Sequence, residues 1–502
     1  MTLVDLPNAH SPLILTIDVG SSSTRTLLFD QAGREITGSL ARESHTLHTS
    51  ADGGVEDDPD AALERIERCI DVTLASVGTT AIGAVAVTTY VSNVLGVAAD
   101  HRPLTPIYLY ADTRNAADAA HLRKQLDEHE ILDRTGCPLR ANYLPARLRW
   151  LQRTQANVVR QVWRWVTLGE YMLLRWFGEV QVSFSVASWS GLLDRRRLQW
   201  DEQLLAVTGL DPARLSQLVD ANAPTSGLRA DYARRWPALT QIPWFPAIGD
   251  GAAANLGSGC ADPAHIALTI GTSGALRAVL PNVEQVPFGL WCYRVDQRRA
   301  LLGGATSEGG NVFAWMREVL RLADPAGVEA ALASGEPDGH GLTVLPFLAG
   351  ERSPGWASDA RATISGLSLN TTANDMLRAG LEAVACRFGR IARLLTPHLP
   401  SQPAFVVSGG ALLNSPSWCQ ILADVLGCPL YASAVSEPSS RGVALLAVES
   451  LGLGNNRDLF PLEFTQIYTP NPVHHQRYLA AMERQHELYE RLVAASGDET
   501  KA

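Results

Sequence analysis

Lysine is almost missing from this chain of 502 residues, which contains it only at Lys124 and Lys501. A Gly-x-x-x-x-Gly-Lys phosphate loop and the strand lysine of a protein kinase are therefore both excluded. Any phosphate group bound here has to be held by backbone N–H groups, hydroxyls, arginine and a metal ion.

Paired cysteines, long apolar runs and excess positive charge are missing too. The seven cysteines stand singly, which fits neither a zinc site nor a disulfide framework and predicts buried free thiols. No apolar run is long enough to span a bilayer, and the first residues lack the features of a secretory signal. The net charge of −10 argues against a nucleic-acid or anionic-membrane partner. We therefore expect a cytoplasmic protein that binds neither nucleic acid nor a membrane.

One stretch near the N-terminus, residues 13–30, organises the rest of the prediction. An apolar run ends in Asp18-Val19-Gly20-Ser21-Ser22-Ser23, and a second apolar run follows, which predicts a β-hairpin with a turn of small residues. Such a turn offers backbone N–H groups and hydroxyls to phosphate oxygens, and Asp18 at the strand end is placed to hold a cation over them. An ordinary hairpin with an exposed turn would have the same pattern. The candidate phosphate-binding residues are Gly20, Ser21, Ser22 and Ser23.

The same pattern returns about half a chain later. Residues 265–270 form an apolar run that leads into Gly271, Thr272, Ser273 and Gly274, and residues 275–280 form the next run. Internal repetition predicts two related domains, each offering a phosphate-binding hairpin to a shared cleft. The length of the chain also favours two domains.

A carboxylate between two glycines comes just before the second hairpin. A predicted strand over residues 244–248 runs into Gly249-Asp250-Gly251 and a helix start rich in small residues. The glycines would let a substrate approach Asp250 closely, and a helix N-terminus favours anions. An ordinary helix-capping aspartate is the alternative interpretation.

Four further loops carry candidate ligand contacts. The loop after a predicted strand over residues 82–87 contains Val91, Ser92 and Asn93, and ligands bind at such strand ends in α/β proteins. Asp112 and Arg114 place a carboxylate beside a guanidinium at a helix start, where a capping aspartate and a surface arginine are equally expected. Gly409 and Gly410, in one loop of the second half, would admit a flat base or a ribose. The candidate ATP- or phosphate-binding residues of two such loops are Gly310, Asn311, Gly409, Gly410, Ala411 and Asn414.

Hydrophobic periodicity also predicts several longer elements. Helices are expected over residues 60–76, 144–177, 374–395 and 475–495, and a strand is expected within 184–193. Residues 305–309 lie between a strand and a helix, loosely like the nucleophile elbow of a serine hydrolase, with His340 and His398 as candidate bases. Because the first elbow glycine is replaced and both hairpins stay unexplained, this alternative is the weaker one.

Taken in chain order, these motifs resemble the FGGY carbohydrate kinases, within the actin, hexokinase and Hsp70 superfamily. The resemblance runs from about residue 13 to residue 451 and is closest to the gluconokinase-like branch. It departs from that branch at residues 90–93, where the branch carries an aromatic-Trp-His sequence. Arg147 also stands where the family has lysine. Residues 52–56, 111–114, 134–138, 290–294 and 348–356 carry the likeness to the branch.

The resemblance implies an α/β fold of two actin-like (ribonuclease H-like) domains. Each would be a mixed five-stranded sheet flanked by helices, with a cleft between the two domains. The expected divisions are a lead-in over residues 1–12, a sugar-binding domain over 13–256, an ATP-binding domain over 257–455 and a helical tail over 456–502.

The resemblance also implies the activity. We expect ATP-dependent phosphorylation of a primary hydroxyl of a small sugar, sugar acid or polyol, foremost D-gluconate, with Asp250 as general base and with Mg²⁺ held by Asp18 and Asp250. Asp250 and Gly251 would also contact the substrate, and a homodimer is compatible with the family. A xylulokinase-like or other pentose or polyol kinase is one alternative. An ATPase switch of the actin or Hsp70 type, without a sugar acceptor, is the other.

Overall fold

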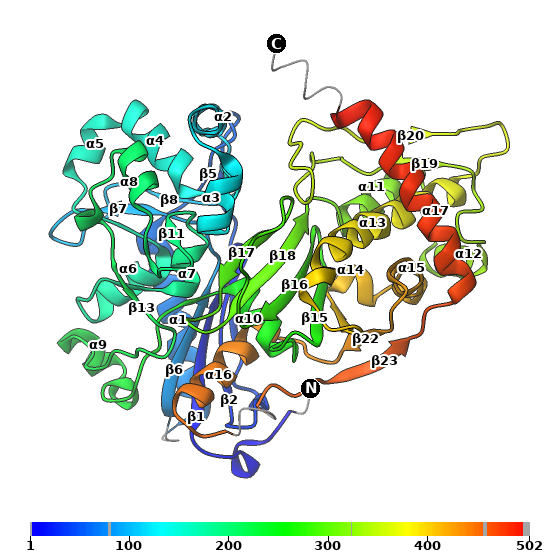
Figure 1. The fold of residues 1–502 in the computed structure, drawn as a ribbon. Helices are drawn as coiled ribbons and strands as arrows, with labels where there is room; N and C mark the ends of the chain where they lie inside the picture. The colour runs from blue at the N-terminus through cyan, green and yellow to red at the C-terminus, as the bar shows by residue number, and fades with distance from the viewer. Residues whose placement is uncertain (1–2, 79–81, 323, 455–458, 495–502) are drawn as a thin grey trace.

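Two β-sheets dominate the computed structural model, which describes residues 3–78, 82–322, 324–454 and 459–494 (Figure 1). The first sheet has the strand order β14-β6-β1-β2-β3. Its central strand, β1, is buried along its whole length, which accounts for the unbroken apolar run in the sequence. The predicted first hairpin is confirmed, because β1 and β2 pair antiparallel. The strands of this sheet are β1 (Leu13–Val19), β2 (Ser23–Phe29), β3 (Ala41–Ser44), β6 (Ile82–Thr89) and β14 (Ile248–Gly249).

The second sheet has the order β17-β18-β16-β15-β21-β22-β23 and contains the second predicted hairpin, β15 with β16. It has seven strands where five were expected. One additional strand, β23, comes from the segment predicted as a helical tail, and its mostly exposed side chains give no strand signal in the sequence. The strands are β15 (His265–Ile270), β16 (Gly274–Leu280), β17 (Trp291–Arg294), β18 (Ala300–Thr306), β21 (Ala404–Ser408), β22 (Leu430–Ser433) and β23 (Phe464–Tyr468).

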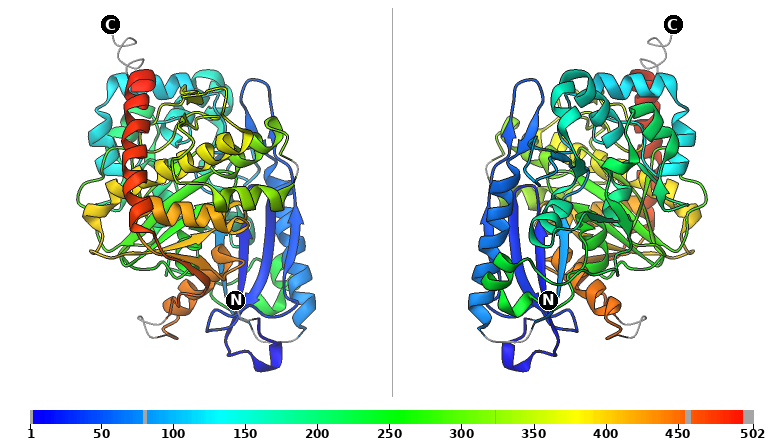
Figure 2. Two further views of the ribbon diagram at one scale, coloured as in Figure 1. Left: turned by 90° about the vertical axis from the view of Figure 1, so that its right-hand side faces the viewer. Right: turned by 90° about the vertical axis from the view of Figure 1, so that its left-hand side faces the viewer.

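Three predicted helices are confirmed and begin at identifiable caps. The side chain of Asp58 caps α1 (Pro59–Val77), and Thr372 and Asp375 form a reciprocal capping box at α13 (Ala373–Leu395). Asn471 caps α17 (Pro472–Tyr489), which runs along the outside of the second half in Figure 2. Its buried Tyr478 and Met482 join the core formed by α13 and the second sheet.

Three predictions of secondary structure are wrong. The strand expected over residues 244–248 is confined to β14, Ile248–Gly249. The aromatic segment 144–177 is not continuously helical: the short strand β9 (Arg164–Val166) interrupts it and pairs with β7 (Leu95–Val97). The expected strand within 184–193 begins instead as α7 (Phe184–Ser188), since the hydroxyl of Ser183 accepts a hydrogen bond from the N–H of Val186 and caps a helix there.

The remaining elements surround the two sheets. In the first half the helices are α2 (Ala116–Gln125), α3 (Glu128–Thr135), α4 (Leu144–Thr154), α5 (Ala156–Gln161), α6 (Leu168–Trp176), α8 (Glu202–Thr208) and α9 (Ala230–Arg235). In the second half they are α11 (Gly310–Val319), α12 (Pro325–Ser334), α14 (Gly410–Leu413) and α15 (Pro416–Leu426). Short strands are β4 (His48–Thr49), β5 (Val55–Asp57), β8 (Ile107–Tyr108), β10 (Gln181–Ser183), β11 (Leu193–Asp194), β12 (Gln199–Trp200), β13 (Gln217–Val219), β19 (Thr343–Leu345) and β20 (Thr363–Ser365). Among the described residues, no helix combines the length and apolarity needed to cross a membrane.

Two helices join the halves of the chain: α10 (Asp250–Gly257) and α16 (Pro438–Ser450). They touch backbone to backbone, because a Cβ on Gly257 would lie 1.8 Å from the carbonyl oxygen of Pro438 and one on Gly442 would lie 1.9 Å from that of Ala253. Their apolar residues share one core cluster with strands of both sheets. Figure 1 shows both helices in the lower middle of the molecule, between the strands of the first and second sheets.

Candidate active site

Each hairpin turn is closed by a hydrogen bond that the N–H of its first glycine donates, across four residues in the first turn and three in the second. In the first, the N–H of Gly20 donates to the carbonyl of Ser23 over 3.0 Å, and in the second the N–H of Gly271 donates to the carbonyl of Ser273 over 3.0 Å. The predicted repeat is therefore present as geometry as well as sequence. Both turns consist of small residues, so the polar groups at their tips are not covered by bulky side chains.

A cavity of about 350 Å³ brings part of the predicted site together. Its wall includes the first turn, through Ser21, and the whole of the second turn. Asp250 and Gly251, at the start of α10, and Val91 and Ser92, after β6, complete the predicted part. The cavity therefore places a carboxylate beside two phosphate-type turns.

Asp250 is the first residue of α10, and one of its carboxylate oxygens accepts a hydrogen bond of 2.8 Å from the N–H of Gly251. Burial raises the pKa of this carboxyl, while the Gly251 N–H and the Arg277 guanidinium oppose the rise. The flanking glycines are needed for packing: a Cβ on Gly249 would lie 2.7 Å from the indole nitrogen of Trp189, and one on Gly251 would lie 3.2 Å from its ring. The glycines therefore admit Trp189, a residue of this chain, against the aspartate.

Asp18 lies at the end of β1 and is buried. Its carboxylate faces the guanidinium of Arg25 at 3.4 Å and accepts a hydrogen bond of 3.2 Å from the hydroxyl of Ser440 on α16. Burial is the main cause that raises its pKa to about 6; Asp250 and Glu437 raise it further, whereas Arg25 and Ser440 lower it. Carboxylate oxygens such as those of Asp18 and Asp250 are the ligands that divalent cations prefer, whereas Glu437 is paired with Arg25 and Arg42.

The loops predicted to receive the nucleotide lie against the second turn. The N–H of Gly310 donates to the carbonyl of Gly271 over 2.8 Å, and the N–H of Asn311 donates to that of Thr272 over 3.1 Å. Gly409 has a φ of +98°, and a Cβ there would lie 2.3 Å from the carbonyl oxygen of Ile270. A Cβ on Gly410 would meet nothing within 4 Å, so this glycine borders open space. Ala411 follows in α14, and Asn414 is exposed at the end of that helix.

Three residues predicted to contact substrate are held elsewhere. Asn93 is fully buried and braces its own loop, donating to the carbonyl of Tyr90 over 2.6 Å and accepting from the N–H of Leu168 over 2.8 Å. Arg114 binds the carboxylates of Asp112 and Glu56. Neither Asp112 nor Arg114 is in the cavity wall, and their pairing matches the alternative interpretation of a local ion pair.

An aromatic wall was missed. Trp189 stacks on Tyr293 with ring centroids 3.6 Å apart, and Trp291 stacks on Tyr293 at 4.4 Å. All three line the cavity, as do Tyr90, Tyr110, Asn142, Arg277 and Arg352. Trp291, Tyr293 and Arg352 lie in residues 290–294 and 348–356, two segments in which the sequence resembles the gluconokinase-like branch. No pattern in the sequence pointed to Trp189 or Arg277.

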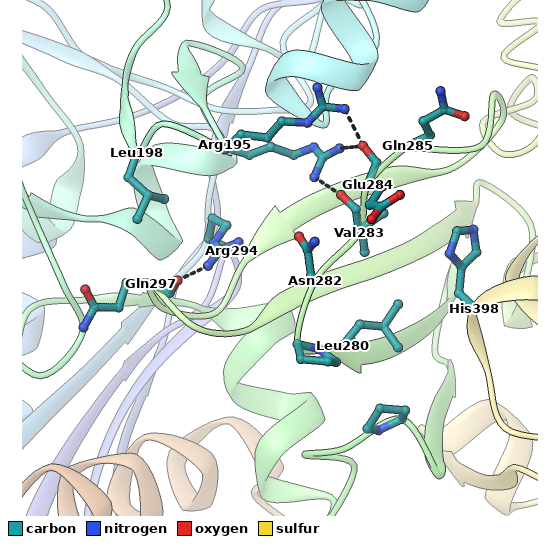
Figure 3. A pocket seen from close by; sticks show the side chains of 13 residues that line it. Arg195, Leu198, Leu280, Asn282, Val283, Glu284, Gln285, Arg294, Gln297 and His398 are labelled. Atoms are coloured by element: carbon teal, nitrogen blue, oxygen red, sulfur yellow. Dashed lines mark hydrogen bonds between the residues drawn. The ribbon is translucent and has the colours of Figure 1, made fainter.

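A second depression, of about 1200 Å³, is larger but contains neither hairpin turn. It lies at the far end of β16, and Figure 3 shows that its arginines are already engaged. Arg195 donates to the carbonyls of Val283 and Glu284 at 2.5 and 3.1 Å, and Arg294 donates to the carbonyl of Asp296 at 2.9 Å. The contacts of Arg195 tie the two halves of the chain together and that of Arg294 is local, so these guanidinium groups already have partners within the protein.

The two histidines that the serine hydrolase alternative requires as bases have other contacts in the structure. The ring of His340 is hydrogen-bonded to Glu382 at 3.0 Å, and its other nitrogen accepts from the N–H of Leu342. His398 lines the second depression. Among the described residues, no hydrogen bond joins Ser307 to either histidine.

Comparison with known proteins agrees with this geometry. The model of the FGGY family of carbohydrate kinases, N-terminal domain, matches residues 13–257, and the C-terminal domain model matches residues 266–451. A gluconokinase of Bacillus subtilis (strain 168) is 26% identical over 92% of this chain and 92% of its own length. A xylulose kinase of Lactococcus lactis subsp. lactis is 24% identical over 93% of this chain and 94% of its own length. A crystal structure of gluconate kinase from Lactobacillus acidophilus superimposes with a TM-score of 0.90 at 24% identity, covering 97% of this chain and 99% of that one.

Proposed function

The chain belongs to the FGGY family of carbohydrate kinases, and from this premise we propose that it phosphorylates D-gluconate to 6-phosphogluconate with ATP. The observation that carries the proposal is the position of Asp250, a partly buried carboxylate in a cavity shared with both hairpin turns. The similarity to gluconokinases over nearly the whole chain supports the choice of acceptor.

Asp250 is the general base of the proposed reaction. It accepts the proton of the primary hydroxyl while that oxygen forms a bond to the γ-phosphorus, and the bond between the γ-phosphorus and the bridging oxygen breaks to release ADP. Because the Gly251 N–H occupies one carboxylate oxygen, the other is left to receive the proton. Burial makes this carboxylate a stronger base than an exposed aspartate.

The remaining contribution of the protein is positioning and charge stabilisation, since phosphoryl transfer needs little covalent chemistry from it. The turns at Gly20–Ser23 and Gly271–Ser273 would receive the phosphate oxygens, and Gly409, Gly410, Ala411 and Asn414 would receive the adenosine. Asp18 and Asp250 would hold Mg²⁺ largely through water, and the metal ion when bound would neutralise charge on the phosphate oxygens.

A neutral sugar such as xylulose is the second candidate acceptor. Two observations favour it: the changed loop at residues 90–93 and the stacked wall of Trp189, Trp291 and Tyr293, whose apolar faces suit a sugar ring or chain. Xylulose kinases are also among the relatives of similar identity.

The test is ADP release with Mg-ATP and a panel of gluconate, xylulose, ribulose, glycerol, erythritol and their acids. We expect gluconate to give the highest kcat/KM. A neutral pentose or polyol as the best acceptor would replace gluconate by the second candidate. Steady ATP hydrolysis that is indifferent to every acceptor would overturn the assignment of an acceptor altogether.

A further inference from the structure

Arg277 is a charged side chain in the cavity wall without a counter-ion. It lies on β16, and its Nε would be 3.5 Å from a Cβ built on Gly251, so the guanidinium group lies over the first turn of α10. That Nε is buried and has no hydrogen-bond partner. Among the described residues, no carboxylate lies within 4.0 Å of the Arg277 nitrogens. The electrostatic influence of Asp250 reaches Arg277 but is not a direct ion pair.

Arg352 is the second such group. It belongs to a loop held by hydrogen bonds on both sides of it, from the N–H of Glu351 to the carbonyl of Ala357 at 2.8 Å and from the N–H of Ser353 to that of Ala305 at 2.9 Å. The loop is therefore fixed, while the Arg352 side chain makes no hydrogen bond or ion pair with the described residues. Both guanidinium groups line the same cavity; burial lowers the pKa of Arg277, and the positive charge of Arg352 lowers it further.

Several buried arginines of this chain have carboxylate partners, whereas Arg277 and Arg352, both partly buried, have none among the described residues. Arg387 pairs with Glu351, Arg378 pairs with Glu382 at 2.7 Å, and Arg441 pairs with Glu463 at 2.8 Å. Taking a charge out of water without a partner is costly, so proteins rarely leave one that way outside a binding site. The fixed charges in the cavity wall are these two guanidinium groups and one carboxylate, Asp250, which leaves a net positive wall.

We propose that Arg277 and Arg352 bind the carboxylate of the acceptor and thereby select a sugar acid over a neutral sugar. The inference rests on the proposed function and adds the residues that set its specificity. A planar guanidinium donates two parallel hydrogen bonds to a carboxylate, which gives affinity and orientation together. With the carboxylate held at the arginines, the other end of the acid is free to present a primary hydroxyl to Asp250.

The experiment compares gluconate with gluconamide, in which a neutral amide replaces the carboxylate, for the unaltered protein and for Arg277→Gln and Arg352→Gln. We expect the unaltered protein to prefer gluconate, and each variant to raise KM for gluconate about 10- to 100-fold, the loss expected for charge-assisted hydrogen bonds. KM for gluconamide and KM for ATP should change little. Arg277→Lys, which keeps the charge but not the fork, should recover part of the preference.

Arg298→Gln is the matched control, because Arg298 is an exposed arginine in the turn between β17 and β18 and its side chain pairs with no described residue. Circular dichroism and ATP binding establish that each variant is folded. A rise in KM for ATP with an unchanged preference for gluconate over gluconamide would place the arginines on the phosphate and overturn the inference. If the unaltered protein instead uses only neutral acceptors, the proposed function fails, and that result is visible before any variant is made.

Discussion

The first hairpin places Asp18 opposite Arg25 across its two strands, whereas the second places Thr269 opposite Ala275 at the corresponding register. Asp18 and Thr269 each contact a serine from another element. The hydroxyl of Ser440 lies 3.2 Å from the Asp18 carboxylate, and the hydroxyl of Ser408 lies 2.9 Å from that of Thr269. One backbone design therefore serves two tasks. The first hairpin has carboxylate chemistry suited to a cation, and the second has neutral groups that leave the binding of anions to backbone N–H groups.

The largest effect on activity is expected at Asp250, which directly follows strand β14 of the first sheet. Asp250→Asn keeps the shape of the side chain but removes its basicity, so we expect kcat to fall by about 10²- to 10⁴-fold. The affinity for ATP should be retained, since the turns that would receive the phosphates are unchanged. ADP release and calorimetric titration with ATP measure the two quantities. Near-normal turnover would remove Asp250 from the role of base.

Much of this comparison was accessible from the sequence, because hairpins with small turns are local features. The turn residues and the strands on either side of them follow each other directly in the chain, and the structure confirms both hairpins. Asp250 was also found locally, between its two glycines. Ser440 was not found, because it reaches Asp18 from 422 residues away in the chain, across the contact of α16 with the first sheet.

The parts that sequence reasoning missed depend on such long-range contacts. No motif in the sequence included Trp189, and only packing places it against Gly249 and Tyr293. Strand β23 has four exposed residues of five, and only its hydrogen bonds to β22 make it a strand. The side chains of Asp112 and Arg114 are of types that bind ligands. In the folded protein they form an ion pair with each other, which their spacing in the sequence does not reveal.

The second-largest effect is expected at Asp18, the carboxylate of the first hairpin. Asp18→Asn should raise the Mg²⁺ concentration for half-maximal activity by about 10-fold or more, because one carboxylate ligand is lost. The same change should raise the free energy of unfolding at pH 7.5 by about 1–3 kcal/mol, because a desolvated charge is removed. Arg25 keeps its contact with Glu437, so it is not left unpaired.

The sign of this stability effect follows from the direction of the shift. The pKa of Asp18 is raised to about 6 from 3.8, so the folded protein binds this proton more tightly than the unfolded chain does. The stabilisation by that proton is complete below about pH 4 and is lost as the pH rises through about 6. The advantage of Asp18→Asn should therefore be present at pH 7.5 and disappear near pH 4. Urea unfolding at both pH values measures it, and an equal advantage at both would contradict the shifted carboxyl.

The region around the second, uncharged hairpin is tested at two adjacent glycines, Gly409 and Gly410. Gly409→Ala should destabilise the fold by about 1–3 kcal/mol, because the positive φ and the carbonyl of Ile270 both oppose a side chain. Gly410→Ala has neither obstacle in the protein and should leave thermal stability unchanged, while its methyl group in the open space raises KM for ATP by about 10-fold, a cost of about 1.4 kcal/mol. Thermal unfolding and ATP kinetics of both variants separate folding from binding. If Gly410→Ala has normal ATP kinetics, the adenosine is not received there.

The smallest effect compares the two serines that touch corresponding positions of the hairpins. The hydroxyl of Ser440 lowers the pKa of Asp18, acting together with Arg25 against burial, Asp250 and Glu437. Ser440→Ala should therefore move the acid limb of the pH–activity profile upward by about half a unit, the effect of one modest hydrogen bond. Ser408→Ala removes a hydroxyl from Thr269, which has no charge to stabilise, so the acid limb should stay in place. Equal shifts in both variants would mean that the acid limb does not report the ionisation of Asp18. The proposed difference between a charged first hairpin and a neutral second hairpin would then be contradicted.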